Sequence, residues 1–184
     1  SRTVIMVARS DQMERMHAFR EEMGSLTQMD ELSAQHVLQL HPLMREDYVA
    51  GGLRDNDGFE IDVAALHQGY LRQLNANGGL LICSAAAEEI TRENGNWAIA
   101  TPAGKFTAPL VVNAAGAWAD QINVLAGQNE TGLVPKRRTM IVVASPPELD
   151  NSSLPMIVDI DEQFYVKPDA GQFILSPADE TPSP

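Results

Sequence analysis

A turn of small residues between an apolar run and a helical pattern is the part of this sequence best suited to binding an anion. The apolar run 109–112 predicts a strand, and Ala114, Ala115 and Gly116 follow it with almost no side chain. Such a turn lets backbone N–H groups come close to a ligand, and the start of a helix favours negative charge there. Taken alone, the pattern is also typical of an ordinary strand-to-helix connection.

The helix after this turn is predicted from the spacing of its apolar side chains. Trp118, Ile122 and Leu125 fall on one face, and Gly127 stands just past the last of them. A glycine in that position commonly ends a helix. The sequence therefore predicts a strand, a tight turn and a short helix in direct succession.

The composition narrows the function classes. The 184 residues suffice for one domain, or one domain and a piece of another, and 44% of them are hydrophobic, as in a soluble globular protein. The net charge of −12 argues against nucleic-acid binding, which needs clustered Lys and Arg. No apolar run approaches the roughly 18 residues of a membrane span, and no signal peptide opens the chain. We therefore expect neither a nucleic-acid partner nor a transmembrane segment.

The cysteine and histidine residues predict structural roles rather than metal binding. Cys83 is the only cysteine, which suits a reducing compartment and a cytoplasmic location, and its apolar neighbours predict a buried thiol. No Cys, Asp or Glu joins His36 and His41 at metal-ligand spacing. We therefore expect no metal site and interpret both histidines as solvated or structural.

The remaining patterns predict strands and helices in mixed order. Helices are expected after the capping residues Ser10, Ser33 and Asp62. Strands are expected, in chain order, over residues 3–8, 48–53, 80–83, 85–92, 97–101, 133–144, 156–160, 164–166 and 172–176. Pieces of βαβ type therefore alternate with a run of antiparallel strands, which predicts an α+β architecture of two intermixed layers.

Several strings in the chain resemble one family of flavoenzymes. Residues 111–120 read VVNAAGAWAD, and residues 62–69, 135–139 and 164–171 read DVAALHQG, PKRRT and FYVKPDAG. The first string resembles the FAD-contacting segment of the flavin-dependent amino-acid oxidases and dehydrogenases, the family of D-amino-acid oxidase, glycine oxidase and sarcosine oxidase. The other three, in this order, resemble most the FAD-dependent D-amino-acid dehydrogenases typified by D-arginine dehydrogenase.

The resemblance implies FAD as the cofactor, held largely by backbone atoms. In the family, one contact to the adenine side comes from the strand after a Gly-Gly pair, and that register falls on Ala87, which in isolation is simply a strand residue. The turn supplies the next contacts, at Ala114, Ala115 and Gly116, with Trp118 nearby. Backbone amides can make such contacts whatever side chain is present.

The chain also departs from the family pattern, because it contains no Gly-x-Gly. The resemblance implies an α+β fold: an antiparallel-sheet substrate domain with helices, plus part of an FAD-binding α/β domain lacking its N-terminal Gly-rich βαβ unit. Residues 1–60 and 130–184 would form mainly the substrate-binding domain, and residues 61–129 mainly the remnant of the FAD-binding domain. We expect the isolated chain to bind FAD weakly or not at all and to show no turnover.

The resemblance further implies a substrate site built from side chains. The subgroup places an arginine of the Arg-Arg-Thr string against the substrate carboxylate, and strand alternation favours Arg138 over Arg137. Tyr165 is the catalytic candidate, because it matches a family tyrosine whose hydroxyl can bind the substrate carboxylate or amine. Met156 and Val158 share one strand face and match positions that line the substrate side-chain pocket, although both also fit a plain core.

The function implied is oxidative deamination of D-amino acids to 2-oxo acids and ammonia by hydride transfer to FAD. The partners would be a small amino acid or amine and an unidentified electron acceptor. A glycine- or sarcosine-type oxidase that uses oxygen is one alternative, and the sequence does not separate the two. A stand-alone binding module without catalysis is the other.

Overall fold

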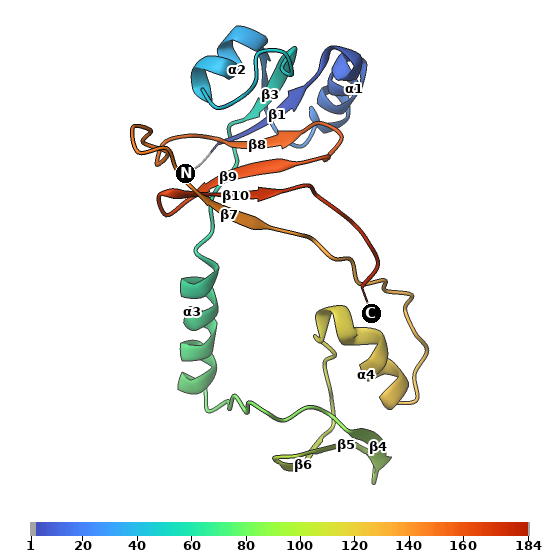
Figure 1. Cartoon of the computed structure of the whole chain (residues 1–184). Helices are drawn as coiled ribbons and strands as arrows, with labels where there is room; N and C mark the ends of the chain where they lie inside the picture. Colours follow the sequence, from blue (N-terminus) through green and yellow to red (C-terminus); the bar gives the residue numbers. More distant parts are fainter. Residues whose placement is uncertain (1–2, 184) are drawn as a thin grey trace. The chain divides into compact units, whose positions relative to one another are not determined.

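The computed structural model describes residues 3–183, which divide into two compact units. The first unit joins the N-terminal part of the chain, up to Ile61, to the later stretch Arg137–Thr181 (Figure 1). The second unit contains Asp62–Lys136. The first unit is therefore assembled from two stretches that are distant in sequence.

A seven-stranded sheet forms the centre of the first unit. Its strands are β1 (Val4–Ala8), β2 (Met29–Ser33), β3 (Gly51–Asp55), β7 (Ile141–Ala144), β8 (Met156–Asp159), β9 (Tyr165–Asp169) and β10 (Gln172–Ser176). They lie in the order β2-β3-β1-β8-β9-β10-β7 (Figure 1). Neighbouring strands are antiparallel except β1 and β8, which are parallel. The early and late stretches of the chain thus meet at the β1–β8 pair.

Two helices pack on opposite faces of this sheet. They are α1 (Met13–Met23), which follows the 3-10 helix η1 (Ser10–Gln12), and α2 (Ala34–Leu40), which follows β2. Successive side chains of a strand point to opposite faces. On β1, Ile5 and Val7 therefore pack with Val37 of α2, whereas Ala8 packs with Met16 of α1. The first unit has a hydrophobic cluster on each side of its sheet.

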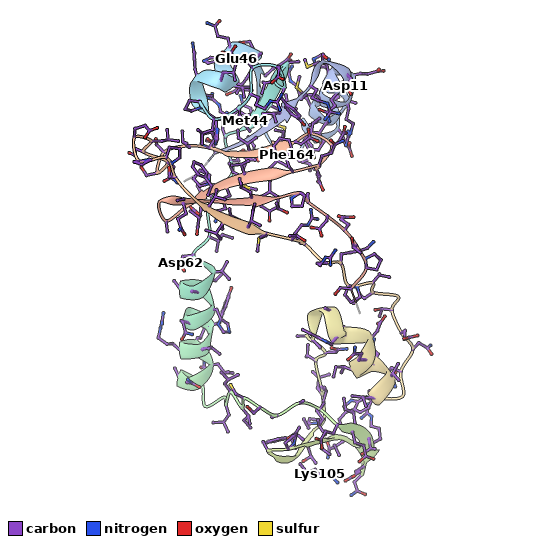
Figure 2. The ribbon with its side chains drawn as sticks, in the orientation of Figure 1. Asp11, Met44, Glu46, Asp62, Lys105 and Phe164 are labelled. Atoms are coloured by element: carbon purple, nitrogen blue, oxygen red, sulfur yellow. The ribbon has the colours of Figure 1, made fainter. Side chains whose placement is uncertain are left out.

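A glycine on β3 lets α2 approach the sheet closely. A Cβ at Gly52 would lie 3.0 Å from Cγ2 of Val37 and 3.2 Å from Cγ2 of Ile5, closer than packed carbon atoms come. Met44 and Phe164 close the same cluster at its margin (Figure 2). This side of the sheet therefore has no room for a larger residue at position 52.

The second unit has little buried surface. Its elements are α3 (Val63–Ala76), β4 (Glu89–Glu93), β5 (Asn96–Thr101), β6 (Gly104–Ala108), the 3-10 helix η2 (Gly116–Trp118) and α4 (Ala119–Leu125). The strands pair antiparallel in the order β4-β5-β6. None of the described α3 residues is buried, and Tyr70 on its apolar face is 63% exposed. Local contacts define this helix: the Asp62 carboxylate accepts a hydrogen bond from the Ala65 N–H at 2.8 Å (Figure 2).

Several predictions from the sequence are confirmed. The class is α+β, with a strand at residues 172–176 as predicted. Ser33 caps α2, because its hydroxyl accepts a hydrogen bond from the His36 N–H at 3.3 Å. Asp62 caps α3 in the same way. The helix after the small-residue turn ends before Gly127, which has a φ of 65°.

Other predicted strands are wrong or too long. Residues 80–83 and 109–112 form no strand, and the predicted strand 133–144 is reduced to β7. An apolar run indicates a strand, but a strand also needs a neighbour to complete its hydrogen bonds. No described segment pairs with residues 80–83 or 109–112. Cys83, predicted to be buried, is exposed because the run around it is not packed.

The start of the first helix and three strands also differ from the prediction. Ser10 opens a 3-10 turn rather than capping α1, and the Gln12 side chain accepts the hydrogen bond from the Arg9 N–H at 2.9 Å. β2 and β6 were not predicted, because their sequences MDELS and GKFTA carry no apolar run. β4 begins at Glu89, so Ala87 precedes this strand instead of lying within it.

Candidate functional site

The small-residue turn in the second unit is organised by the asparagine that precedes it. Asn113 accepts a hydrogen bond from the Ala115 N–H at 3.2 Å through Oδ1. Its Nδ2 donates to the Ala119 carbonyl at 2.8 Å and to Oδ1 of Asn123 at 2.9 Å. Asn113 thus ties the turn to α4. Sequence reasoning missed this role, although an Asn before a turn is a common signal for such side-chain contacts.

The turn itself leaves its backbone open to an approaching group. Gly116 has a φ of 56°, a conformation that favours glycine, and a Cβ there would meet no described atom within 4 Å. Ala114 is exposed, and Trp118 is 64% exposed. A cofactor bound mainly through backbone contacts fits this arrangement. Ala87 lies in the same unit, in the segment between α3 and β4.

The carboxylate of Asp120 holds the chain after α4. Asp120 accepts hydrogen bonds from the N–H and hydroxyl of Thr131, at 2.7 and 2.6 Å. It also accepts from the N–H groups of Gly132 and Leu133, at 2.9 and 3.0 Å. These contacts, the Thr131 hydroxyl first among them, hold the pKa of Asp120 below its ordinary value. The segment that follows the turn is therefore fixed by one ionised side chain.

In the first unit, the sheet brings together three of the four predicted substrate residues. Val158 of β8 stands opposite Tyr165 of β9, which in turn stands opposite Ser176 of β10. Directly opposed residues share a face, and Met156 shares it because it lies two residues from Val158. All three candidates are half-buried, whereas the intervening Ile157 is fully buried in the α2 cluster. On this strand it is therefore Ile157, and not Met156 or Val158, that occupies a hydrophobic-core position.

The fourth predicted residue, Arg138, lies outside the regular strand. β7 begins at Ile141, so Arg137 and Arg138 precede the strand. The strand alternation that favoured Arg138 over Arg137 therefore does not apply to them. The two guanidinium groups differ in their partners instead. Arg137 pairs with Asp179 at 3.4 Å, and Arg138 donates to Glu180 at 3.1 Å. Both arginine side chains are exposed to solvent.

An apolar hollow of about 500 Å³ lies near these residues. It is lined by Thr139, Ile141, Phe164, Tyr165, Val166, Leu175, Ser176 and Pro177. Ile141, Leu175 and Val166 stand opposite one another across three strands, so they share a face. That face is the one opposite to the face shared by Tyr165 and Val158. Of the four predicted substrate residues, Tyr165 alone lines the hollow, so the hollow does not enclose the predicted substrate site.

A buried polar network holds the hairpin that carries Val158 and Tyr165. The Asp159 side chain accepts hydrogen bonds from the Tyr48 hydroxyl at 2.8 Å and from Nε2 of Gln12 at 3.3 Å. It also accepts from two backbone N–H groups of the β8–β9 turn, at 3.0 and 3.3 Å. Burial, together with the hydrogen bond from the hydroxyl to Asp159, raises the pKa of Tyr48. Sequence reasoning missed Asp159, because its partners lie more than a hundred residues away.

The described residues contain neither a cluster of potential metal ligands nor a membrane-spanning helix. Among residues 3–183 there is no group of three or more His, Cys, Asp or Glu side chains placed to hold a metal ion. Of the helices described, none is long and apolar enough to cross a membrane. These findings are limited to that part of the chain.

The fold of this chain is similar to those of solved oxidases. L-alpha-glycerophosphate oxidase from Mycoplasma pneumoniae, solved with FAD bound, has a TM-score of 0.85 at 18% identity, over 95% of this chain and 48% of that one. Glycine oxidase from Geobacillus kaustophilus has a TM-score of 0.75 at 19% identity, over 100% of this chain and 48% of that one. At such identities the likeness establishes the fold, and the chain spans about half the length of those proteins.

The family follows from a match over the whole chain. The chain belongs to the DAO family of FAD dependent oxidoreductases, whose model matches residues 1–184. FAD is accordingly the cofactor that family membership indicates. The mitochondrial dimethylglycine dehydrogenase of Rattus norvegicus is 26% identical over 149 residues, which are 79% of this chain and 17% of that protein. The human enzyme of that name is 25% identical over the same length.

Proposed function

We propose that the protein expressed from its complete reading frame catalyses oxidative deamination of D-amino acids, as D-arginine-type dehydrogenases do. The products are a 2-oxo acid and ammonia, and an acceptor other than oxygen reoxidises the flavin. Family membership supports the flavin chemistry. The observation that carries the choice of site is the shared sheet face of Met156, Val158 and Tyr165, set by the opposition of Val158 and Tyr165.

In this proposal each candidate side chain has one task. The Arg138 guanidinium binds the substrate carboxylate at two points. The Tyr165 hydroxyl hydrogen-bonds the carboxylate or the amine, and Met156 and Val158 contact the substrate side chain. Bound FAD supplies the hydride acceptor, while the protein supplies orientation. The substrate amine must be neutral before hydride leaves, so activity should rise with pH.

The two units divide this work in our proposal. The first unit would supply the substrate contacts, and the second the FAD contacts at Ala87, Ala114, Ala115, Gly116 and Trp118. We expect the isolated 184-residue chain to bind FAD weakly or not at all, because these contacts are few and mostly backbone. Absorbance after gel filtration with FAD measures this directly. A stable yellow protein made from these residues alone would contradict the expectation.

A second candidate function is oxidation of glycine, sarcosine or a related small amine with oxygen as acceptor. The likeness to glycine oxidases and to dimethylglycine dehydrogenases favours it. The rate at which oxygen reoxidises the reduced flavin separates an oxidase from a dehydrogenase. A non-catalytic binding module is the remaining alternative, and a Gly-x-Gly-x-x-Gly sequence upstream in the same reading frame would exclude it.

The deciding experiment is anaerobic flavin bleaching of the full-length protein. The panel holds basic and apolar D-amino acids, glycine, sarcosine and dimethylglycine. Rapid bleaching by D-amino acids alone supports the first proposal, and bleaching by the glycine derivatives alone supports the second. If bound FAD is bleached by none of them, both substrate proposals fail.

We further propose a cytoplasmic location, supported by a single cysteine that needs no oxidising compartment. Immunodetection after cell fractionation tests it. Recovery in an exported fraction would overturn it.

A further inference from the structure

The segment that carries Arg138 is not held by a regular strand ladder. β7 begins three residues later, at Ile141. Two backbone hydrogen bonds tie the start of the segment to the C-terminal stretch: the Arg137 N–H donates to the Thr181 carbonyl, and the Ser183 N–H donates to the Pro135 carbonyl, each at 2.9 Å. At Thr139 the backbone N–H donates to a side chain instead, Oδ1 of Asp179, at 2.6 Å. The direction of this segment therefore depends on that carboxylate.

Asp179 contacts three donors in this segment. Besides the Thr139 N–H, it accepts a hydrogen bond from the Thr139 hydroxyl at 2.8 Å and from Nε of Arg137 at 3.4 Å. Its side chain is only 22% exposed. The Thr139 N–H, followed by the Thr139 hydroxyl, holds the pKa of Asp179 below its ordinary value. The carboxylate is thus an ionised clamp on both neighbours of Arg138.

The clamp treats the two arginines differently. Arg137 is drawn onto Asp179, so its guanidinium is engaged within the fold. Among the described residues, Arg138 contacts only Glu180, to which one terminal nitrogen donates at 3.1 Å. The two side chains are 39% and 59% exposed, and exposed ion pairs of this kind are weak. An incoming carboxylate can therefore displace Glu180 from Arg138.

The geometry points to Asp179 as a positioning residue for carboxylate recognition. By holding Thr139 on one side of Arg138 and Arg137 on the other, it fixes where the Arg138 guanidinium projects. This inference rests on the proposed function, because Arg138 is the carboxylate-binding residue only in that proposal. Asp179 itself touches no substrate. It acts by keeping the guanidinium in place before the ligand arrives, which saves the ordering cost on binding.

The main test is Asp179→Asn in the full-length holoenzyme. The amide keeps the shape of the side chain but retains one acceptor oxygen for three donors. We expect the KM for a carboxylate-bearing substrate to rise about tenfold, while kcat at saturation changes by less than about twofold. Titration with propanoate, a carboxylate without an amine, followed by the flavin spectrum, should show a similar loss of affinity. Hydrogen exchange at the Thr139 amide should accelerate.

Two further variants keep the test decisive. Thr139→Val removes the hydroxyl contact to Asp179 and preserves the backbone contact, so it should raise KM by less than Asp179→Asn does. It also takes the place of Asp179→Asn if that variant does not fold. Asp150→Asn is the matched control: Asp150 is an exposed acid of the same unit whose carboxylate accepts a hydrogen bond from the Ser152 N–H. It should leave KM and propanoate affinity unchanged.

The outcomes separate this inference from the proposed function. Unchanged propanoate affinity in both Asp179→Asn and Thr139→Val would overturn the role of Asp179. A loss of kcat without a rise in KM would also overturn it, because that pattern indicates general damage. If the wild-type flavin is bleached by no amine, the proposed substrate class fails, whereas the propanoate titration still decides whether Asp179 governs carboxylate binding.

Discussion

The two units of this protein hold their candidate residues by different means. In the first unit, Val158 and Tyr165 stand on a sheet that has hydrophobic clusters on both faces. In the second, the Asn113 side chain holds the turn at Ala114–Gly116, Asp120 holds the segment after α4, and α3 presents no buried residue. Side-chain recognition needs a rigid packed support, whereas recognition by backbone amides needs only a locally fixed turn.

This comparison predicts that core mutations will act almost wholly on the first unit. Ile157→Ala removes a fully buried side chain from the α2 cluster, so we expect it to lower the free energy of unfolding of that unit by about 2–4 kcal/mol. Leu66→Ala on the exposed face of α3 should change it by less than about 0.5 kcal/mol in the isolated chain. Urea denaturation of both variants measures the difference. Equal losses would contradict the contrast between the units.

The buried polar network around Asp159 should contribute nearly as much to the free energy of unfolding as the apolar core does. Asp159→Ala leaves the Tyr48 hydroxyl and two backbone N–H groups of the β8–β9 turn without their acceptor, while the Gln12 amide keeps its contact to Asp161 at 2.8 Å. We expect this to cost about 2–3 kcal/mol. Tyr48→Phe removes the hydrogen bond that the hydroxyl donates to Asp159 and the one that it accepts from Arg9 at 3.2 Å. It leaves the carboxylate its other donors and should cost about 1 kcal/mol. Thermal unfolding of the two variants tests this order. A larger loss for Tyr48→Phe than for Asp159→Ala would show that the Tyr48 hydroxyl, not the carboxylate, holds the hairpin.

The first unit should also lose stability in acid through His41. This side chain is 1% exposed, no hydrogen-bond partner is found for its ring nitrogens among the described residues, and burial lowers its pKa below 6.5. Because the unfolded chain binds a proton more readily, stability is complete above pH 6.5 and falls below it. The loss is at most about 1.4 kcal/mol per pH unit until the lowered pKa is reached.

Urea midpoints measured between pH 7.5 and pH 5 check this dependence. His41→Phe should flatten the profile, since the replacement ring cannot titrate and its neighbour is the ring of Phe173, at 6.2 Å between centroids. His36→Gln, at an exposed position on α2, is the control and should leave the profile as it is. A profile unaffected by His41→Phe would assign the acid sensitivity to other groups.

The smallest effect on global stability is expected in the second unit, at Asp120. Asp120→Asn leaves one acceptor oxygen for four donors, so the amides of Thr131, Gly132 and Leu133 should exchange faster with solvent. The denaturation midpoint of the first unit should not move. Hydrogen exchange read by mass spectrometry measures both. A shifted midpoint would mean that the units are coupled more strongly than their separate packing indicates.

The sequence predicted local features better than long-range ones. The caps at Ser33 and Asp62 and the glycine after α4 depend on neighbouring residues, and all three were predicted correctly. The apolar runs 80–83 and 109–112 were wrongly assigned as strands, because pairing depends on a partner that the run itself does not specify.

The candidate site shows the same division. The shared face of Met156 and Val158 follows from alternation, which sequence reasoning used, and the sheet adds Tyr165 to that face. The contacts of Asp159 and Asp179 could not be predicted, since each joins residues that only the folded chain brings together. The roles of Arg138 and of the residues proposed to contact FAD stay predictions.

The parallel pair β1–β8 has a consequence for how the protein is made. Its register joins Val4 to Met156, so β1 leaves the ribosome long before its partner β8. During synthesis, one edge of β1 stays open while the whole second unit emerges. Closing such a long loop slows folding, and an open apolar edge invites pairing with other chains. The order in which the chain is built therefore delays completion of this sheet until the second unit has emerged.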